Sequence, residues 1–290
     1  DDDDDDECVQ TGFVKATKKD IKTFNHSKSA FVLETLLHVI LSCGSPETSI
    51  VPRPLFLARV EPRYNTRRLS REMRDNFGIQ RNSIIIGMEA LHMDGWKMVS
   101  KGSQKEMLSF ILQACYLVHV ANQKGLQFTH RDFHPGNIMC KKNNRKRKTI
   151  HLFKGATIRP TYIWLFIDFG MSCITKFGLC NQQSKKQDIF LPPQEETPYS
   201  EDMKMFCGKD SQDYDMRLFF HSIYDTRDEM KGSNKPLVRF LENWLGKRFG
   251  KSSWHDSYGT NKTKKDKHMF SPEQCIKKVW KYVLRQHIQL

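Results

Sequence analysis

The segment FTHRDFHPGNIMC, residues 128–140, places a carboxylate and a carboxamide close together in the chain. Asp132 precedes Asn137 by five residues, and a histidine, a proline and a glycine stand between them. A second carboxylate, Asp168, ends the apolar run IWLFID, and Gly170 follows two residues later. Carboxylate and amide oxygens are ligands that Mg²⁺ prefers. The three polar residues therefore predict metal-assisted chemistry on a phosphate.

Each of these residues has a separate task in phosphoryl transfer, which depends on positioning and charge neutralisation. Asp132 would orient the attacking hydroxyl and accept its proton, a contribution of about a hundredfold to ten-thousandfold. Asn137 and Asp168 would bind Mg²⁺, which keeps water and substrate phosphates in its other coordination positions. Gly170 would allow the backbone to turn sharply after the metal ligand.

Hydrophobic patterning predicts the elements that position these residues. Residues 50–60 read as a turn that leads into a strand, and residues 82–91 read as a buried strand. Residues 162–168 are expected to form a strand that ends at Asp168. The best predicted helix covers residues 105–125 and ends near Gly125, with an inner face formed by Leu108, Ile111, Leu112, Cys115 and Val118.

Further helices are expected at residues 29–43, 213–225 and 236–249. Ser271 caps a closing helix that begins with Pro272. A basic, hairpin-like insertion is expected at residues 141–160. Strands and one helix followed mainly by helices predict an α+β fold.

The motifs HRDFHPGN and DFG, in this order, resemble the catalytic loop and the metal-binding loop of the protein kinase superfamily. The resemblance covers roughly residues 11–240. It implies a two-lobed fold with an acidic tail at 1–9, a small, strand-rich N-lobe at 10–92 and a helical C-lobe at 93–290. It also implies ATP and Mg²⁺ as cofactors, and transfer of the γ-phosphate to Ser or Thr hydroxyls of a protein substrate.

The resemblance assigns nucleotide-binding roles to residues of the first third of the chain. Lys15, in FVKAT, and Glu34, in FVLETLL, would form the ion pair that holds the ATP phosphates. Met88 corresponds to the gatekeeper and Glu89 to the first hinge residue. The backbone near Leu91 would then bind adenine.

Two further assignments concern the support of the catalytic loop. A buried aspartate on a following helix would brace the loop, and Asp215 fits this role, with Asp213 as the alternative. Arg131 would either receive a phosphate carried by Thr197, Tyr199 or Ser200, or have a purely structural role.

The chain also departs from the family pattern. Only fourteen residues precede Lys15, seven of them acidic, and they include one glycine, Gly12, so a glycine-rich phosphate loop is absent from them. We expect either that upstream sequence supplies this loop or that activity is weak or lost. His134 stands where ordinary protein kinases have lysine, which resembles haspin-like kinases and small-molecule kinases of the aminoglycoside and choline type.

Three functions therefore stay open at this point. The first is a divergent Ser/Thr protein kinase, which Arg131 and the intact DFG favour. The second is a pseudokinase or binding module, and the third is a small-molecule kinase, which His134 favours. The long insertion, IDFGMS and DYDMRLFF additionally resemble kinase-like proteins of large DNA viruses.

Composition indicates a folded chain with anionic partners. The 290 residues are 38% hydrophobic and 28% charged, as expected for a globular protein. The net charge is +14, and because the first seven residues contribute −7, the remainder carries +21. The densest basic run, Lys141–Lys148, is either a solvated loop or a contact for nucleic acid or nuclear targeting.

The expected location is intracellular, in the cytoplasm or nucleus of a cell, or in a virion. Eight scattered cysteines without a CxxC spacing predict reduced thiols and no zinc site. No secretory signal is expected, and the sequence holds no run of eighteen apolar residues that would predict a membrane-spanning helix.

Overall fold

The computed structural model describes residues 35, 37–42, 49–59, 84–123, 127–143, 148–170, 172–174, 211–230, 232–249 and 270–290. These residues form a mixed α+β structure in which small antiparallel sheets pack with helices. The predicted α+β class is therefore confirmed. Lys15, Glu34, Asp1–Cys8, Gly125 and the residues Thr197, Tyr199 and Ser200 lie outside the described residues.

The sheet that positions the candidate site has three strands in the order β3 (Met93–Asp94), β5 (Ile138–Lys142) and β8 (Tyr162–Phe166). β5 and β8 are antiparallel, and Ile138 lies opposite Phe166. β8 is apolar and almost entirely buried, which suits the aromatic and branched residues that form it. The register brings the start of β5 and the end of β8 to the same edge of the sheet.

The other strands form pairs. β1 (Pro54–Arg59) pairs with β2 (Ile84–Met88), β4 (Phe128–Thr129) with β9 (Cys173–Ile174), and β6 (Ile150–Phe153) with β7 (Ala156–Ile158). β6 and β7 form the predicted hairpin, and Gly155 in its turn has a φ of 82°, a conformation that favours glycine. Lys141 and Lys142 belong to β5, so the insertion begins after them.

The central helix is α4 (Gln104–Gln123). The five residues of its predicted inner face are fully buried, but so are Met107, Phe110 and Ala121 on other faces. The prediction of one inner face was therefore too narrow, because α4 is covered by β8 on one side and by helices on others.

The remaining helices are α3 (Gly95–Lys101), α6 (Ser211–Asp225), α7 (Lys235–Phe249) and α9 (Pro272–Arg285). Short 3-10 helices occur at η3 (Pro135–Asn137), η6 (Arg227–Glu229) and η7 (Gly232–Asn234). Ser271 caps α9 as predicted, because its hydroxyl accepts a hydrogen bond from the Gln274 amide. Residues 37–42 are also helical.

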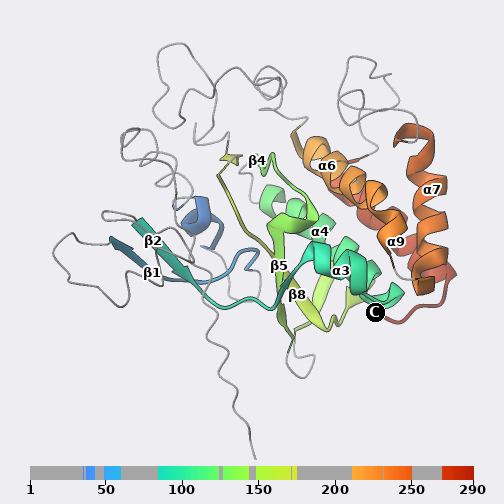
Figure 1. The fold of residues 1–290 in the computed structure, drawn as a ribbon, viewed down its shortest axis with the longest axis horizontal. Coiled ribbons are helices and arrows are strands. Elements are labelled where there is room, and N and C mark those ends of the chain that lie inside the picture. The colour runs from blue at the N-terminus through green and yellow to red at the C-terminus, as the bar shows by residue number, and fades with distance from the viewer. Residues whose placement is uncertain are drawn as a thin grey trace, which may run out of the picture.

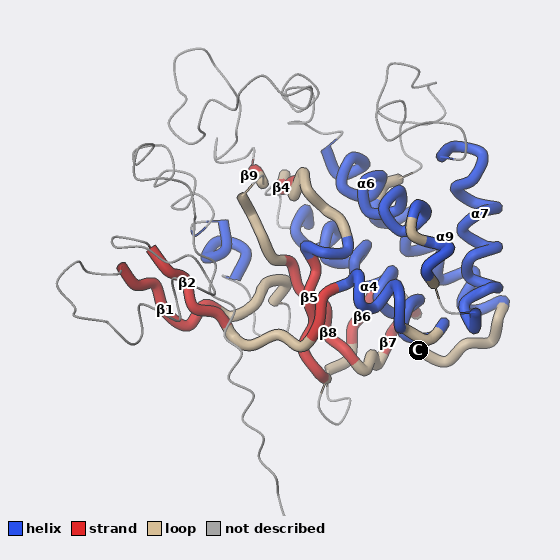
Figure 2. The backbone as a smooth tube through the Cα atoms, viewed as in Figure 1, coloured by secondary structure: helices blue, strands red, loops and turns tan. Residues whose placement is uncertain are grey.

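Figure 1 shows the β1–β2 pair at one end of the described structure and α7 at the other. Strands β5 and β8 run through the middle, and α6, α7 and α9 lie on the side away from β1 and β2 (Figure 2). α9 packs along α4. Cys115, Cys140 and Cys275 are buried and form no disulfide. None of the helices in the described ranges is both long and apolar enough to cross a membrane.

Candidate active site

The loop from His130 to Asn137 connects β4 to β5 and carries the predicted catalytic residues. Phe133 anchors it: its ring is fully buried and stacks on Phe219 of α6, with centroids 5.2 Å apart. The residues on either side of Phe133 point the other way, so Asp132 keeps 46% of its side chain exposed and His134 keeps 30%. One apolar residue in the sequence Asp-Phe-His thus fixes two polar residues at the surface.

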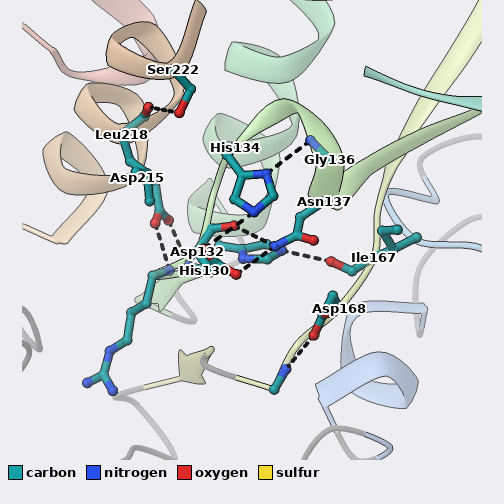
Figure 3. A network of polar contacts seen from close by, with 12 residues as sticks. His130, Asp132, His134, Gly136, Asn137, Ile167, Asp168, Asp215, Leu218 and Ser222 are labelled. Atoms are coloured by element: carbon teal, nitrogen blue, oxygen red, sulfur yellow. Dashed lines mark hydrogen bonds and ion pairs between the residues drawn. The ribbon is translucent and has the colours of Figure 1, made fainter. Parts of the chain in front are cut away.

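Asp132 and Asn137 meet as their spacing predicts. The Asn137 Nδ2 donates hydrogen bonds to the Asp132 backbone oxygen (2.8 Å) and to Asp132 Oδ2 (2.9 Å) (Figure 3). Because both bonds use the amide nitrogen, Asn137 Oδ1 is directed away from Asp132, and no described residue donates a hydrogen bond to it. The side chain is therefore oriented as a potential oxygen ligand.

His134 lies against the carboxylate of Asp132. Its Nδ1 accepts a hydrogen bond from the Gly136 amide (3.0 Å), so in the neutral ring the proton is on Nε2. Nε2 lies 3.5 Å from Asp132 Oδ1. The interaction with His134 lowers the pKa of Asp132 below its usual value, and the Asn137 hydrogen bond adds to this effect, while partial burial opposes it. Asp132 is therefore ionised at neutral pH.

The second carboxylate, Asp168, follows β8 at the same edge of the sheet. The Ile167 amide donates to the Asn137 backbone oxygen (3.1 Å), which places Asp168 directly beyond the Asn137–Ile167 pair. Asp168 has a φ of 60°, and its Oδ1 accepts a hydrogen bond from the Gly170 amide (3.3 Å). Figure 3 shows Asp168 below Asn137.

In chemical type, these two side chains are ligands that a magnesium ion takes. One carboxylate and one amide oxygen match the few protein ligands that Mg²⁺ takes when substrate phosphates complete its shell. The described residues contain no group of three or more His, Cys, Asp or Glu side chains that would hold a metal without a substrate.

Phe169, between Asp168 and Gly170, is buried in an aromatic cluster. Its ring contacts Phe128, His130 and His38, with centroids 5.6–6.2 Å apart. His38 lies in the helical segment 37–42, and its Nε2 donates to the Pro52 backbone oxygen (2.6 Å). The helical segment 37–42, which follows Glu34 in the sequence, thus contacts Phe169 of the DFG motif.

Asp215 of α6, and not Asp213, binds backbone amides of the loop from His130 to Asn137. Its carboxylate is fully buried and accepts hydrogen bonds from the backbone amides of His130 (2.7 Å) and Arg131 (2.8 Å). Arg131 has a φ of 66°, a conformation that costs a non-glycine residue about 1–3 kcal/mol. The two charge-assisted bonds hold the loop in this conformation.

Arg131 is 4% exposed, and none of its three guanidinium nitrogens has a hydrogen-bond partner among the described residues. The candidate phosphate carriers lie outside the described residues, so both predicted roles of Arg131 stay predictions.

The residues assigned to adenine binding lie at the end of β2. Met88 is half-buried and Leu91 is buried. The Glu89 carboxylate is engaged: Lys141 Nζ lies 2.9 Å from Oε1 and 3.0 Å from Oε2, and the Arg53 amide donates to Oε1. The Glu89 backbone N–H is engaged as well, since it donates to the Arg53 backbone oxygen (2.9 Å). Lys141 is paired with Glu89 and is therefore not part of a free basic run.

Sequence reasoning missed two contacts of the site. One is the Glu89–Lys141 pair, which no short-range pattern indicates because 52 residues separate its members. The other is Trp96 of α3, whose ring stacks on His134 with centroids 5.9 Å apart and an angle of 22°. Gly136 permits this approach, since a Cβ there would lie 2.7 Å from the indole nitrogen. No helix was predicted at residues 95–101, so local pattern gave no signal for this contact.

Comparison with known proteins adds no relative to this description. Neither a protein-family model nor a curated protein matches the sequence of the chain.

Proposed function

We propose that this chain is an ATP-dependent protein kinase that transfers the γ-phosphate to Ser or Thr hydroxyls of a protein substrate. The observation that carries the proposal is the closure of one short loop around Asp132 and Asn137 at the strand edge where Asp168 emerges. The three side chains can then act on a single phosphate. A fold of two lobes that divide near residue 92 is part of the same proposal, and the separation of the β1–β2 pair from α6, α7 and α9 supports it (Figure 1).

Asp132 would be the catalytic base. Its lowered pKa keeps it ionised, so that it can accept a hydrogen bond from the acceptor hydroxyl and take the proton as the oxygen attacks the γ-phosphorus. The new O–P bond forms while the bond between the γ-phosphorus and the bridging oxygen breaks, and ADP leaves. Asn137 and Asp168 would bind Mg²⁺, which supplies positive charge to the phosphate oxygens.

His134 would stand beside the transferred phosphate. Its Nε2–H, directed to Asp132, can donate either to the carboxylate or to a phosphate oxygen. The Met88–Leu91 segment would bind adenine through its backbone, since the Glu89 side chain is already paired with Lys141. Lys15, positioned by its ion pair with Glu34, would hold the remaining phosphates.

The test is transfer of labelled γ-phosphate from Mg²⁺-ATP. The chain would be offered itself, a mixed protein substrate and a pool of small hydroxyl compounds, with Asp132→Asn as the matched inactive variant. Label on protein that disappears with Asp132→Asn is the expected result. No label on any acceptor, while Mg²⁺-ATP still binds, would contradict the proposal and favour a pseudokinase.

The metal assignment has its own test. Asp168→Asn should remove the Mg²⁺-dependent part of ATP binding, measured by calorimetry with and without Mg²⁺, while circular dichroism stays unchanged. Asp132→Asn should leave this affinity nearly intact. Equal Mg²⁺-ATP affinity of wild type and Asp168→Asn would exclude Asp168 as the ligand.

A small-molecule kinase is the second candidate, and one observation favours it. His134, and not a permanently charged lysine, contacts the base. Label on a small hydroxyl compound, and none on protein, would establish this alternative.

A further inference from the structure

A groove lies between α7 and α9, at the opposite end of the described structure from β1 and β2 (Figure 1). Its volume of about 480 Å³ is within the range of ligand-binding pockets. It shares no residue with the catalytic loop or the DFG segment, so the proposed kinase chemistry does not account for it.

Four cationic side chains line this groove. Lys278, Lys281 and Arg285 lie on one face of α9 because they are three and four residues apart, about 4.5 and 6 Å along the helix axis. Arg239 faces them from α7. All four are exposed, and none pairs with a residue in the described part of the chain.

No carboxylate of the two helices balances this charge. Glu242 of α7 and Glu273 of α9 do not line the groove, and each already has a partner, Arg227 and Lys277 respectively. Arg285 occupies the last turn of α9, where the helix dipole favours a cation. That explanation does not extend to the lysines in the middle of α9, so the groove retains unbalanced positive charge.

The floor of the groove is aromatic. Phe240 and Tyr282 stack with centroids 4.3 Å apart, and Trp244 lies 5.6 Å from Phe240. Each of the three rings is only partly buried. The Tyr282 hydroxyl accepts a hydrogen bond from Gln104, and Trp244 packs edge-on against buried Phe220, so the rings are held in place.

Two carboxamides complete the lining, Asn243 and Gln286, and both are exposed. Amide side chains pair with the donor and acceptor edges of nucleobases, aromatic rings stack on their faces, and lysine and arginine bind the phosphates. An acidic peptide would use the cations alone.

We propose that this groove binds a single-stranded polynucleotide, with phosphates on Arg239, Lys278, Lys281 and Arg285 and a base against the aromatic floor. The predicted basic run at residues 141–148 lacks interleaved aromatic residues and has Lys141 paired with Glu89. The groove combines exposed cationic side chains with aromatic rings in one place.

The test is fluorescence anisotropy of the full chain, without ATP, with labelled oligo(U), oligo(dT), a duplex and an abasic strand of equal length. Four phosphate contacts to a single strand predict a slope of log affinity against log salt of about −2.8. Raising salt fourfold would then weaken binding by about fifty-fold. The abasic strand should bind at least about fivefold more weakly, since each stacked base contributes to affinity.

The variant Arg239→Ala/Lys278→Ala/Lys281→Ala should reduce the salt slope to about −0.7. Its charge-matched control is Lys101→Ala/Lys154→Ala/Lys277→Ala, three exposed lysines that do not line the groove, and it should bind almost as the wild type. Circular dichroism of both variants checks that they fold.

Several results would overturn the proposal. Equal affinity for the abasic strand would show simple charge attraction. Tighter binding of poly-glutamate than of oligo(U) or oligo(dT) would indicate an acidic-protein site. Loss of binding in Arg145→Ala/Lys146→Ala/Arg147→Ala, with the groove variant unaffected, would move the site to the basic run. The ratio of oligo(U) to oligo(dT) affinity tells RNA from DNA, and preference for the duplex would exclude a single-strand site.

Discussion

Asp215→Asn should destabilise the chain and disturb the catalytic loop, because Asp215 is the buried acceptor for two loop amides. The asparagine keeps one oxygen, so one of the amides of His130 and Arg131 keeps an acceptor. The other amide would face an NH₂ group. The strained conformation of Arg131, with its φ of 66°, would then lose half of its support.

The magnitude follows from the two bonds. Leaving one buried N–H without an acceptor costs about 1–3 kcal/mol. The remaining bond changes from charge-assisted to neutral, a loss of about 1 kcal/mol. The free energy of unfolding should therefore fall by about 2–4 kcal/mol. With an m-value of about 2 kcal/mol per M, the midpoint of urea unfolding would move down by about 1–2 M.

Urea unfolding and amide hydrogen exchange measure the two parts of this prediction. In the wild type the His130 and Arg131 amides should be among the slowly exchanging ones, and both should exchange faster in Asp215→Asn. The control is Asp228→Asn, an exposed aspartate of η6, which should change stability by less than about 0.5 kcal/mol. If Asp215→Asn shifts the midpoint no more than Asp228→Asn, or leaves both amides protected, the bracing role is refuted.

Three further predictions concern other parts of the site. His134→Lys should shift acceptor preference toward protein by about tenfold in the γ-phosphate assay; an unchanged ratio of protein to small-molecule label would make His134 purely structural. Glu89→Gln removes the partly exposed pair with Lys141 and should lower the unfolding free energy by less than about 1 kcal/mol, as urea unfolding would show. Burial lowers the pKa of His38 and of His130, so below the unfolded-state pKa of about 6.5 the unfolded chain takes up protons that the folded chain does not. Unfolding free energy should thus fall on going from pH 7.5 to 5.5, by at most about 1.4 kcal/mol for each of these two histidines, and His38→Gln should remove its share; higher stability at pH 5.5 would contradict the assignment.

Local pattern was sufficient to predict the elements around the site. The apolar run that forms β8, the helix α4 and the cap at Ser271 depend on residues close in sequence, and each lies within a few residues of its predicted bounds. The pairing of Asp132 with Asn137 was also predictable, because only five residues separate them.

Contacts between distant segments could not be predicted in this way. A positive φ at Arg131 has no local cause, since it depends on Asp215, 84 residues later. The stacking of Trp96 on His134 depends on how α3 packs against η3. The burial of α4 on more than one face likewise depends on helices from the last third of the chain. The roles of Lys15 and Glu34 stay predictions, because both lie outside the described residues.

His130 shows why the two halves of the candidate site form one unit (Figure 3). Its amide donates to Asp215, its Nε2–H donates to the Ile167 backbone oxygen (2.9 Å), and its own backbone oxygen accepts from the Ser172 hydroxyl (3.1 Å). Burial lowers the pKa of this imidazole, and its Nδ1 has no hydrogen-bond partner among the described residues, so the ring is a neutral donor. Asp132 lies two residues after His130, and Asp168 directly follows Ile167. Because buried His130 is bonded to both segments, it fixes the position of the proposed base, Asp132, relative to the proposed metal ligand, Asp168.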